Sequence, residues 1–306
     1  MRIIKPSFEI WDQEEGLEGI YKQIEKAGRV CYKSEDKITE TSAKEFVDRM
    51  IKSGHGAMLE HGTVYLKLNN SMSANVFLIS QKYDRNKYSV VNCKDYENDV
   101  NNRGITYREY FITTNLRVFV ENDWMNDLQY QCEPTEFHEK RVTVKFICDR
   151  GISHEFVRHR VFSFAQESTR YCNYSKDKFQ GITFIQPPWL DGDISNEDGS
   201  KFYDVYTDVY LHTLTTAENA YLDLLKQWDE KVPDKRFKSG YKNNPWTPQQ
   251  ARAVLPNSLK TELVMTGFTK DWGHFFKLRD AGSAHPQARE LAHPLHEEFK
   301  NRNLLK

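Results

Sequence analysis

Residues 158–171 read Arg-His-Arg-Val-Phe-Ser-Phe-Ala-Gln-Glu-Ser-Thr-Arg-Tyr and belong to a local cluster of cationic side chains. The cationic residues from 150 to 170 are Arg150, His154, Arg158, His159, Arg160 and Arg170. On a helix over 152–162, Arg158 and Arg160 would project about 200° apart, so one solvent-exposed stripe cannot hold both. We therefore expect at least one of them to meet a buried partner or a ligand. The alternative is an exposed helix with ordinary surface ion pairs.

The overall composition is that of a folded, water-soluble protein. Of 306 residues, 39% are hydrophobic and 13% aromatic, which excludes the disordered classes. Lys and Arg number 43 against 44 Asp and Glu, so no global field attracts nucleic acid, and an anion site must be local. No apolar run is long enough to span a membrane, and the first residues do not resemble a signal peptide. We expect a cytoplasmic protein that binds neither nucleic acid nor membranes.

The cysteines and histidines do not form a recognisable metal or disulfide pattern. Five cysteines are widely spaced and without a C-x-x-C pair, which is typical neither of a disulfide framework nor of a thiolate zinc site. His154 and His159 miss the H-E-x-x-H spacing by one residue and so would not share a helical face. No metal is expected.

Hydrophobic periodicity around the 158–171 stretch predicts interleaved strands and helices. Strands are expected at 2–12, 64–68, 110–114, 116–120, 141–148, 182–186 and 260–268. Helices are expected at 15–29, 42–54, 152–162, 201–228, 247–254, 271–278 and 286–300. No strand ends in G-x-G-x-x-G or a P-loop, so neither phosphate-binding loop is present.

Three local features give sharper expectations. Ser42 and Glu45 have the spacing of a capping box, and Gly54 is a suitable residue to end that helix and place His55 in a loop. The strands at 64–68 and 141–148 are expected to be sheet neighbours. The buried side of the long helix is expected to carry Val205, Val209, Leu211, Ala217, Ala220 and Leu224.

Arg158-His159-Arg160, seven residues and then Ser168 reproduce the RHR-x7-S signature, and the chain thereby resembles the flavin-dependent thymidylate synthases. Further matches follow in the family's order: Arg29–Tyr32, Gly54–His61, Ala251–Pro256, Leu278-Arg279 and Ala284–Gln287. The resemblance covers most of the chain outside about 70–140, which we interpret as an insertion between two strands.

The resemblance implies an α/β fold of the α+β type, with a mainly antiparallel sheet flanked by helices, in one domain over 1–306. It implies a homotetramer with FAD bound at subunit interfaces. The implied reaction is the methylation of dUMP to dTMP, with methylenetetrahydrofolate as the one-carbon donor and NADPH as the reductant of the flavin.

The resemblance also assigns site residues, by their positions in the matching motifs. The resemblance places on the flavin side His55, Glu60, Arg158, His159, Arg160, Val161, Lys270, His274 and Leu278. It places on the dUMP side Glu155, Arg158, Gln166, Glu167, Ser168, Thr169, Arg170, Arg252 and Arg279. The chain departs from the family pattern on the flavin side at Cys31, Ala57 and Phe268. Arg279 matches the arginine that promotes ionisation of the uracil ring, and His55 and Ser168 complete the catalytic group.

Several interpretations remain open at this point. Ser168 is either a nucleophile or a hydrogen-bond donor to the nucleotide, and without an adjacent base the donor role is favoured. A buried structural role is favoured for Cys172. Other functions compatible with the basic cluster are a flavin oxidoreductase with another substrate and a nucleic-acid or nucleotide-binding protein without catalysis.

Overall fold

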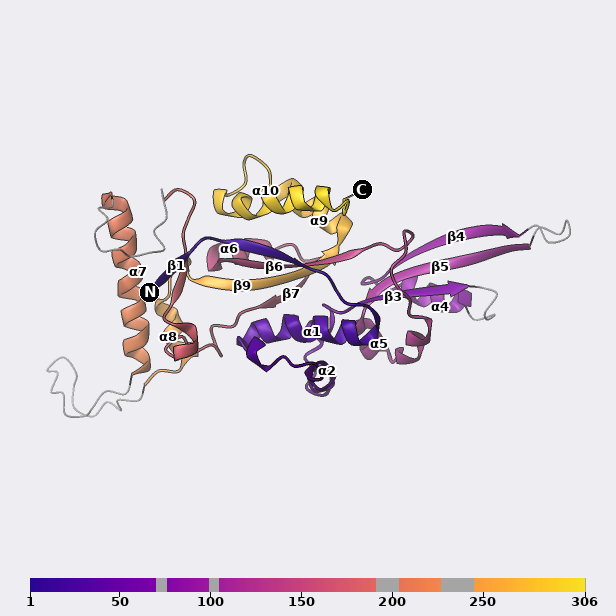
Figure 1. Cartoon of the computed structure of the whole chain (residues 1–306), viewed down its shortest axis with the longest axis horizontal. Helices are drawn as coiled ribbons and strands as arrows, with labels where there is room; N and C mark the ends of the chain where they lie inside the picture. Colours follow the sequence, from indigo (N-terminus) through magenta and orange to yellow (C-terminus); the bar gives the residue numbers. More distant parts are fainter. Residues whose placement is uncertain (70–75, 99–104, 191–203, 227–244, 306) are drawn as a thin grey trace.

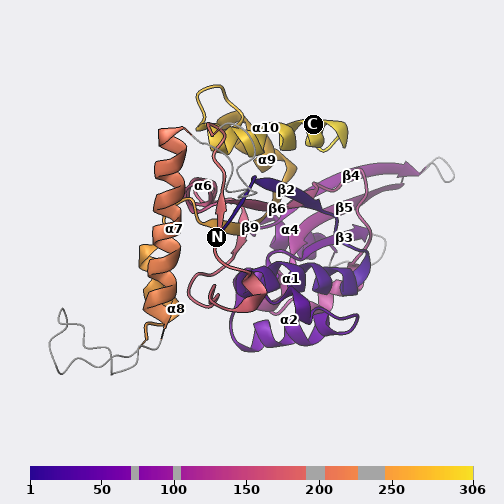
Figure 2. The same ribbon diagram turned by 60° about the vertical axis from the view of Figure 1, so that its left-hand side comes forward.

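A computed structural model of the chain describes residues 1–69, 76–98, 105–190, 204–226 and 245–305. Helices α1 (Gly16–Tyr32) and α2 (Ser42–Lys52) lie on one side of a central sheet, and α9 (Thr269–Arg279) and α10 (Pro286–Asn301) on the other (Figure 1). A second sheet extends from one end, and the long helix α7 (Val205–Leu225) stands at the other end (Figures 1 and 2). None of the helices in the described ranges is long and apolar enough to cross a membrane.

The central sheet is antiparallel throughout, in line with the mainly antiparallel sheet that the resemblance implies. Its strands are, in spatial order, β2 (Ser7–Trp11), β6 (Arg141–Asp149), β9 (Lys260–Phe268) and β7 (Ser163–Gln166). Val144 and Phe146 point to the face that α9 and α10 cover, because alternate side chains of a strand share one face. On the opposite face, Val264 of β9 packs with Ala27 and Val30 of α1. The strands predicted at 141–148 and 260–268 are confirmed.

The four helices beside this sheet are also confirmed, but the predicted capping box is wrong. Thr41 is the N-cap residue of α2, and its side chain makes no capping bond. The Ser42 hydroxyl instead donates to the Glu25 carboxylate, at 2.8 Å. Glu25 is buried, and a buried carboxylate needs donors more than the exposed helix end does.

The second sheet has its own hydrophobic core. Its elements are β3 (Thr63–Asn69), α4 (Val76–Asp84), β4 (Val90–Asn98), β5 (Ile105–Asn115), α5 (Leu116–Asn122) and the 3-10 helix η2 (Met125–Tyr130). β5 is the middle strand and pairs antiparallel with β3 and β4. The expectation that 64–68 and 141–148 are neighbours is therefore wrong, because β5 takes the place beside β3.

The strand predicted at 116–120 is also wrong, since these residues open α5. The Asn115 side chain accepts a hydrogen bond from the backbone N–H of Val118, which starts a helix there. Leu116 and Phe119 are then buried one helical turn apart. The strand predicted at 110–114 is confirmed as part of β5.

A two-stranded parallel sheet and α7 form the other end of the molecule. β1 (Arg2–Ile4) pairs with β8 (Thr183–Ile185), and α8 (Pro248–Ala251) and η4 (Arg252–Val254) follow near α7. The predicted strand at 2–12 is in fact β1 and β2, in two different sheets. Pro6 lies between them and cannot donate to a ladder. The remaining short elements are η1 (Glu35–Lys37), α3 (Gly56–Leu59), α6 (Arg150–Phe156) and η3 (Asp177–Phe179).

The predicted buried side of α7 is wrong at Val205 and Val209, whereas Leu211 and Leu224 do pack against the hydrophobic core at this end. Val205 and Val209 are 73% and 60% exposed, and Leu211, Ala217, Ala220 and Leu224 are only partly buried. The fully buried face carries Thr207, Leu214, Glu218 and Tyr221. Glu218 is buried because it pairs with the N-terminal ammonium of Met1, at 2.9 Å, and accepts from the backbone of Ile182, also at 2.9 Å. Residues 201–203 and 227–228 of the predicted helix lie outside the described residues.

Candidate functional site

Helix α6 is shorter than predicted, and this changes the geometry of the basic stretch. Asp149 caps the helix by accepting from the backbone N–H of Ile152, at 2.7 Å. The helix ends at Phe156, and a series of turns leads to β7 at Ser163. Arg158 and Arg160 therefore lie on turns rather than on the predicted helix over 152–162.

Glu155, His159 and Arg279 form one hydrogen-bonded cluster. The Arg279 guanidinium donates from Nη1 to the Glu155 carboxylate, at 2.5 Å, and from Nη2 to the Glu155 carbonyl, at 2.9 Å. Its Nε donates to His159 Nε2, at 3.1 Å. Burial and then the positive charge of Arg279 lower the pKa of His159 to about 4, so this ring is neutral at pH 7 and accepts the bond.

The predicted flavin-side residues of α9 share an exposed face next to this cluster. Lys270, His274 and Leu278 follow one another at intervals of four residues, and all three are exposed. The ring of His274 lies 6.1 Å from that of His159, which joins this face to the turns at 158–161. The structure thus places the predicted flavin-side residues of α9 next to those of the turns at 158–161.

Arg158 and Arg160 are exposed and have no carboxylate partner among the residues described. Lys270 lies 5.4 Å from the ring of Phe268 and likewise has no described carboxylate partner. Unpaired cations of this kind suit the pyrophosphate of a dinucleotide cofactor, for which the chain has no glycine-rich loop. The residues present therefore fit a flavin dinucleotide.

The predicted nucleotide residues after β7 line a separate pocket of about 310 Å³. Ser168, Arg170 and Arg252 contribute to its wall. Arg252 donates to the Thr169 hydroxyl, at 3.1 Å, and thus has a fixed position beside the loop. The Gln166 amide donates to the Ser153 hydroxyl, at 2.8 Å, which holds the start of this loop against α6.

The hydrogen bonds of Glu167 and Ser168 limit what these two predicted residues can do in the pocket. The Glu167 carboxylate is buried and accepts from Lys260, at 2.8 Å, and from the Tyr174 hydroxyl, at 3.0 Å. It therefore serves the protein interior. The Ser168 hydroxyl accepts from the backbone of Arg170, at 3.3 Å, and no described histidine or carboxylate hydrogen-bonds to it. Without a base, this hydroxyl is suited to bind rather than to attack.

Arg150 belongs to the cationic cluster of residues 150–170 but is not among the predicted site residues. It lines the same pocket as Ser168, Arg170 and Arg252. None of the three arginines of this pocket has a carboxylate partner in the described ranges. Three unpaired guanidinium groups around one hollow are suited to a dianion such as a phosphate monoester. The local density of arginines was the signal that could have identified Arg150.

The segment from His55 to Glu60 forms a third group. Gly54 ends the turn after α2 with a φ of +71°, a conformation that a glycine adopts without strain. His55 is exposed and lines a hollow of about 430 Å³ together with Tyr32, Met58 and Arg117. The Glu60 side chain does not line this hollow and instead accepts from Arg117.

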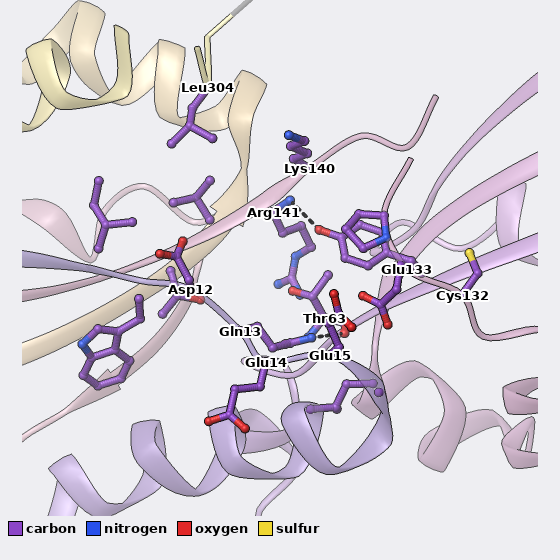
Figure 3. Close-up of a pocket in the computed structure, with 18 of the residues that line it drawn as sticks. Asp12, Gln13, Glu14, Glu15, Thr63, Cys132, Glu133, Lys140, Arg141 and Leu304 are labelled. Carbon is purple, nitrogen blue, oxygen red and sulfur yellow. Dashed lines mark hydrogen bonds between the residues drawn. The ribbon is translucent and has the colours of Figure 1, made fainter. Parts of the chain in front are cut away.

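A cavity of about 390 Å³ at the junction of the two sheets contains none of the predicted site residues (Figure 3). Gln13 and Thr63 are joined there by two hydrogen bonds. The Gln13 side-chain amide donates to the Thr63 carbonyl, at 2.9 Å, and accepts from the Thr63 backbone N–H, at 2.8 Å. Arg141 donates to the carbonyl of Glu60, at 3.0 Å, and to the Thr63 hydroxyl, at 3.3 Å. These pairings join the sheets, and we assign the cavity no ligand.

Comparisons with known proteins agree with the motif. Residues 97–302 match the family model described as thymidylate synthase complementing protein. Over 143 residues the chain is 29% identical to a flavin-dependent thymidylate synthase of Corynebacterium glutamicum and 30% identical to one of Mycobacterium avium. Each alignment covers 47% of this chain and 50% of the relative, so the chain spans about half the length of these curated relatives.

Among solved structures, a UMP/dUMP methylase PolB of Streptomyces cacaoi bound with 5-Br dUMP is 17% identical, with a TM-score of 0.41. That comparison covers 100% of this chain and 93% of the other. The family model alone spans about two thirds of the chain and includes the 158–171 stretch, Arg252 and Arg279. The chain therefore belongs to the thymidylate synthase complementing protein family, to which the resemblance to flavin-dependent thymidylate synthases already pointed.

Proposed function

We propose that the protein is a flavin-dependent thymidylate synthase that methylates dUMP to dTMP, with methylenetetrahydrofolate and NADPH as co-substrates and FAD as cofactor. The observation that carries this proposal is the pocket of Arg150, Arg170 and Arg252 beside Ser168. A pocket with three guanidinium groups that have no carboxylate partner among the described residues favours a small dianion, and the membership of the family supports a nucleotide.

In this proposal the nucleotide phosphate lies among these arginines, with the Ser168 hydroxyl as a further donor. Glu155, Arg158, Gln166, Thr169 and the backbone of Glu167 complete the nucleotide side. Arg279 faces the uracil ring, where it stabilises the negative charge that grows on N3 and O4 as C5 becomes nucleophilic. Glu155 and His159 hold its guanidinium in a fixed plane beforehand.

The flavin side is proposed to comprise the face of Lys270, His274 and Leu278, the turns at 158–161 and the segment from His55 to Glu60. When bound, reduced FAD would supply the hydride that the methylation requires. Arg158, Arg160 and Lys270 would bind its phosphates, and Val161 and Leu278, which are 64% and 48% exposed, would cover apolar parts of its rings.

We also propose that the protein is a cytoplasmic homotetramer built from one domain over 1–306. Val161 and Leu278 in the candidate flavin surface, and Val205 and Val209 on α7, are large exposed apolar side chains. In a tetramer, neighbouring subunits would bury such residues and bring the separate groups of site residues together. Light scattering of the purified protein would test this, and a monomer that retains stoichiometric FAD and full activity would contradict it.

The decisive experiment is spectroscopic. The purified chain is expected to show flavin absorption that bleaches with NADPH under anaerobic conditions and returns when dUMP and methylenetetrahydrofolate are added, with formation of dTMP. Flavin reduction without dTMP would favour an oxidoreductase with another substrate. A colourless protein that binds nucleotides or nucleic acid without turnover would favour the non-catalytic alternative.

A further inference from the structure

The predicted insertion at about 70–140 contacts the candidate flavin side through α5. The backbone N–H of Leu116 donates to the carbonyl of Gly62, at 3.0 Å, at the start of α5. The next residue, Arg117, donates from Nη1 to the Glu60 carboxylate, at 2.5 Å. A residue from the insertion thus reaches the segment between His55 and Glu60.

The backbone of this segment is close-packed against Arg117. A Cβ atom added at Gly56 would lie 3.2 Å from Arg117 Nε and 3.3 Å from Glu121 Oε1. These distances are tighter than ordinary van der Waals contact, so glycine permits the close approach of α5 to this segment.

Two carboxylates from different parts of the chain hold the Arg117 guanidinium. Glu60 binds Nη1, and Glu121 of α5 accepts from Nε, at 2.6 Å. Two bonds from a planar group fix its orientation, and the hydrogen bonds that Arg117 donates to Glu121 and Glu60 raise its pKa despite its partial burial. Nη2 has no hydrogen-bond partner among the residues that the structure describes.

The same side chain forms part of the wall of the 430 Å³ hollow that His55, Tyr32 and Met58 also line. Its positive charge is compensated by the two carboxylates, so the remaining N–H groups are suited to neutral acceptors rather than to a phosphate. Hydroxyl and carbonyl oxygens and aromatic ring nitrogens are such acceptors, and a flavin nucleotide carries all three.

We propose that Arg117 is a flavin-binding residue contributed by the insertion, held in place by Glu60 and Glu121 so that Nη2 donates to the bound flavin nucleotide. The inference rests on the proposed function, because it takes FAD as the occupant of the hollow. It gives the insertion a direct part in cofactor binding.

The test is FAD affinity, measured by quenching of flavin fluorescence in the full-length protein. Arg117→Met retains most of the side-chain length but removes the donors, and it is expected to weaken FAD binding about ten-fold. Arg117→Lys cannot present the planar edge and is expected to recover only part of this loss. Affinity for dUMP, measured on the same variants, is expected to stay within about two-fold of the parent.

Arg108→Met is the matched control. Arg108 lies on β5 in the same insertion and pairs with Asp95, at 2.5 Å, but does not line the hollow. It is expected to leave FAD affinity unchanged.

Parent-like FAD binding by Arg117→Met would overturn the inference. Equal losses of FAD affinity, dUMP affinity and thermal stability would also overturn it, because they would show a merely structural role. A parent protein that bound no FAD would contradict the proposed function itself. A loss of FAD affinity confined to the Arg117 variants would support the inference and would leave the proposed function intact.

Discussion

Arg279 donates to both the carboxylate and the backbone carbonyl of Glu155, so the two residues are joined by hydrogen bonds at 2.5 and 2.9 Å across 124 positions of sequence. Together with the bond from Arg279 to His159, these contacts use all three nitrogens of the guanidinium group. The arginine is therefore oriented before any substrate binds. Preorganised donors of this kind are most effective at charge that develops during a reaction.

Replacement of Arg279 by alanine is expected to lower turnover more than dUMP affinity. Loss of one preorganised donor typically costs about 10²–10³ in rate. Lysine is expected to recover little, because it cannot reproduce the contacts to Glu155 and His159. Single-turnover kinetics and dUMP calorimetry on both variants would measure this. Near-normal turnover with only a higher dUMP dissociation constant would show that Arg279 merely positions the nucleotide.

Arg150→Gln is expected to weaken dUMP binding about ten-fold and to leave the affinity for deoxyuridine unchanged. The reason is that Arg150 lines the pocket assigned to the phosphate, which deoxyuridine lacks. Calorimetry with both ligands measures the difference. Arg302→Gln is a suitable control, because Arg302 follows α10, does not line this pocket and pairs with Glu298, at 2.7 Å. Equal losses for dUMP and deoxyuridine would contradict the assignment.

Cys172→Ala is expected to retain turnover. The thiol is buried, and burial followed by the charge of Glu167 raises its pKa to about 12, so almost no thiolate exists at neutral pH. Rates of dTMP formation by the variant and the parent provide the comparison. A variant that binds FAD and dUMP normally but makes no dTMP would require a covalent thiolate route.

His61 is expected to make the protein less stable at mildly acidic pH. The ring is fully buried and bonds to Thr266, at 2.8 Å, and burial followed by the charge of Arg141 lowers its pKa from 6.5 to about 3. Below pH 6.5 the unfolded chain therefore binds a proton that the folded chain does not. The free energy of unfolding should therefore decrease as the pH is lowered from 6.5 towards 3, by up to about 1.4 kcal/mol per pH unit for this one group.

Urea unfolding between pH 7 and pH 5 would measure this slope. His61→Gln, which retains a hydrogen-bonding side chain, is expected to reduce it, whatever its effect on stability at pH 7. An unchanged slope would show that other groups dominate the acid response.

The sequence was sufficient to predict the elements that carry strong, unambiguous periodicity. The strands at 141–148 and 260–268 and the helices at 271–278 and 286–300 are found where they were expected. Each helix has one buried face that sets its period, whereas the strands are short runs that are mostly buried on both faces. The stretch at 158–171 identified the family directly, since its spacing is specific.

Long-range contacts decided what the sequence could not. Leu116, Phe119 and Val120 fit either a strand or a helix, and the packing of Leu116 and Phe119 in the core of the second sheet favours the helix that the local cap from Asn115 starts. The buried face of α7 depends on the pairing of Glu218 with the N-terminus, which no local pattern reveals. The bonds of Arg279 to Glu155 and of Arg117 to Glu60 likewise join distant positions. Periodicity reports how a segment meets the core, whereas the partner of a charged side chain is set by which segments the folded chain brings together.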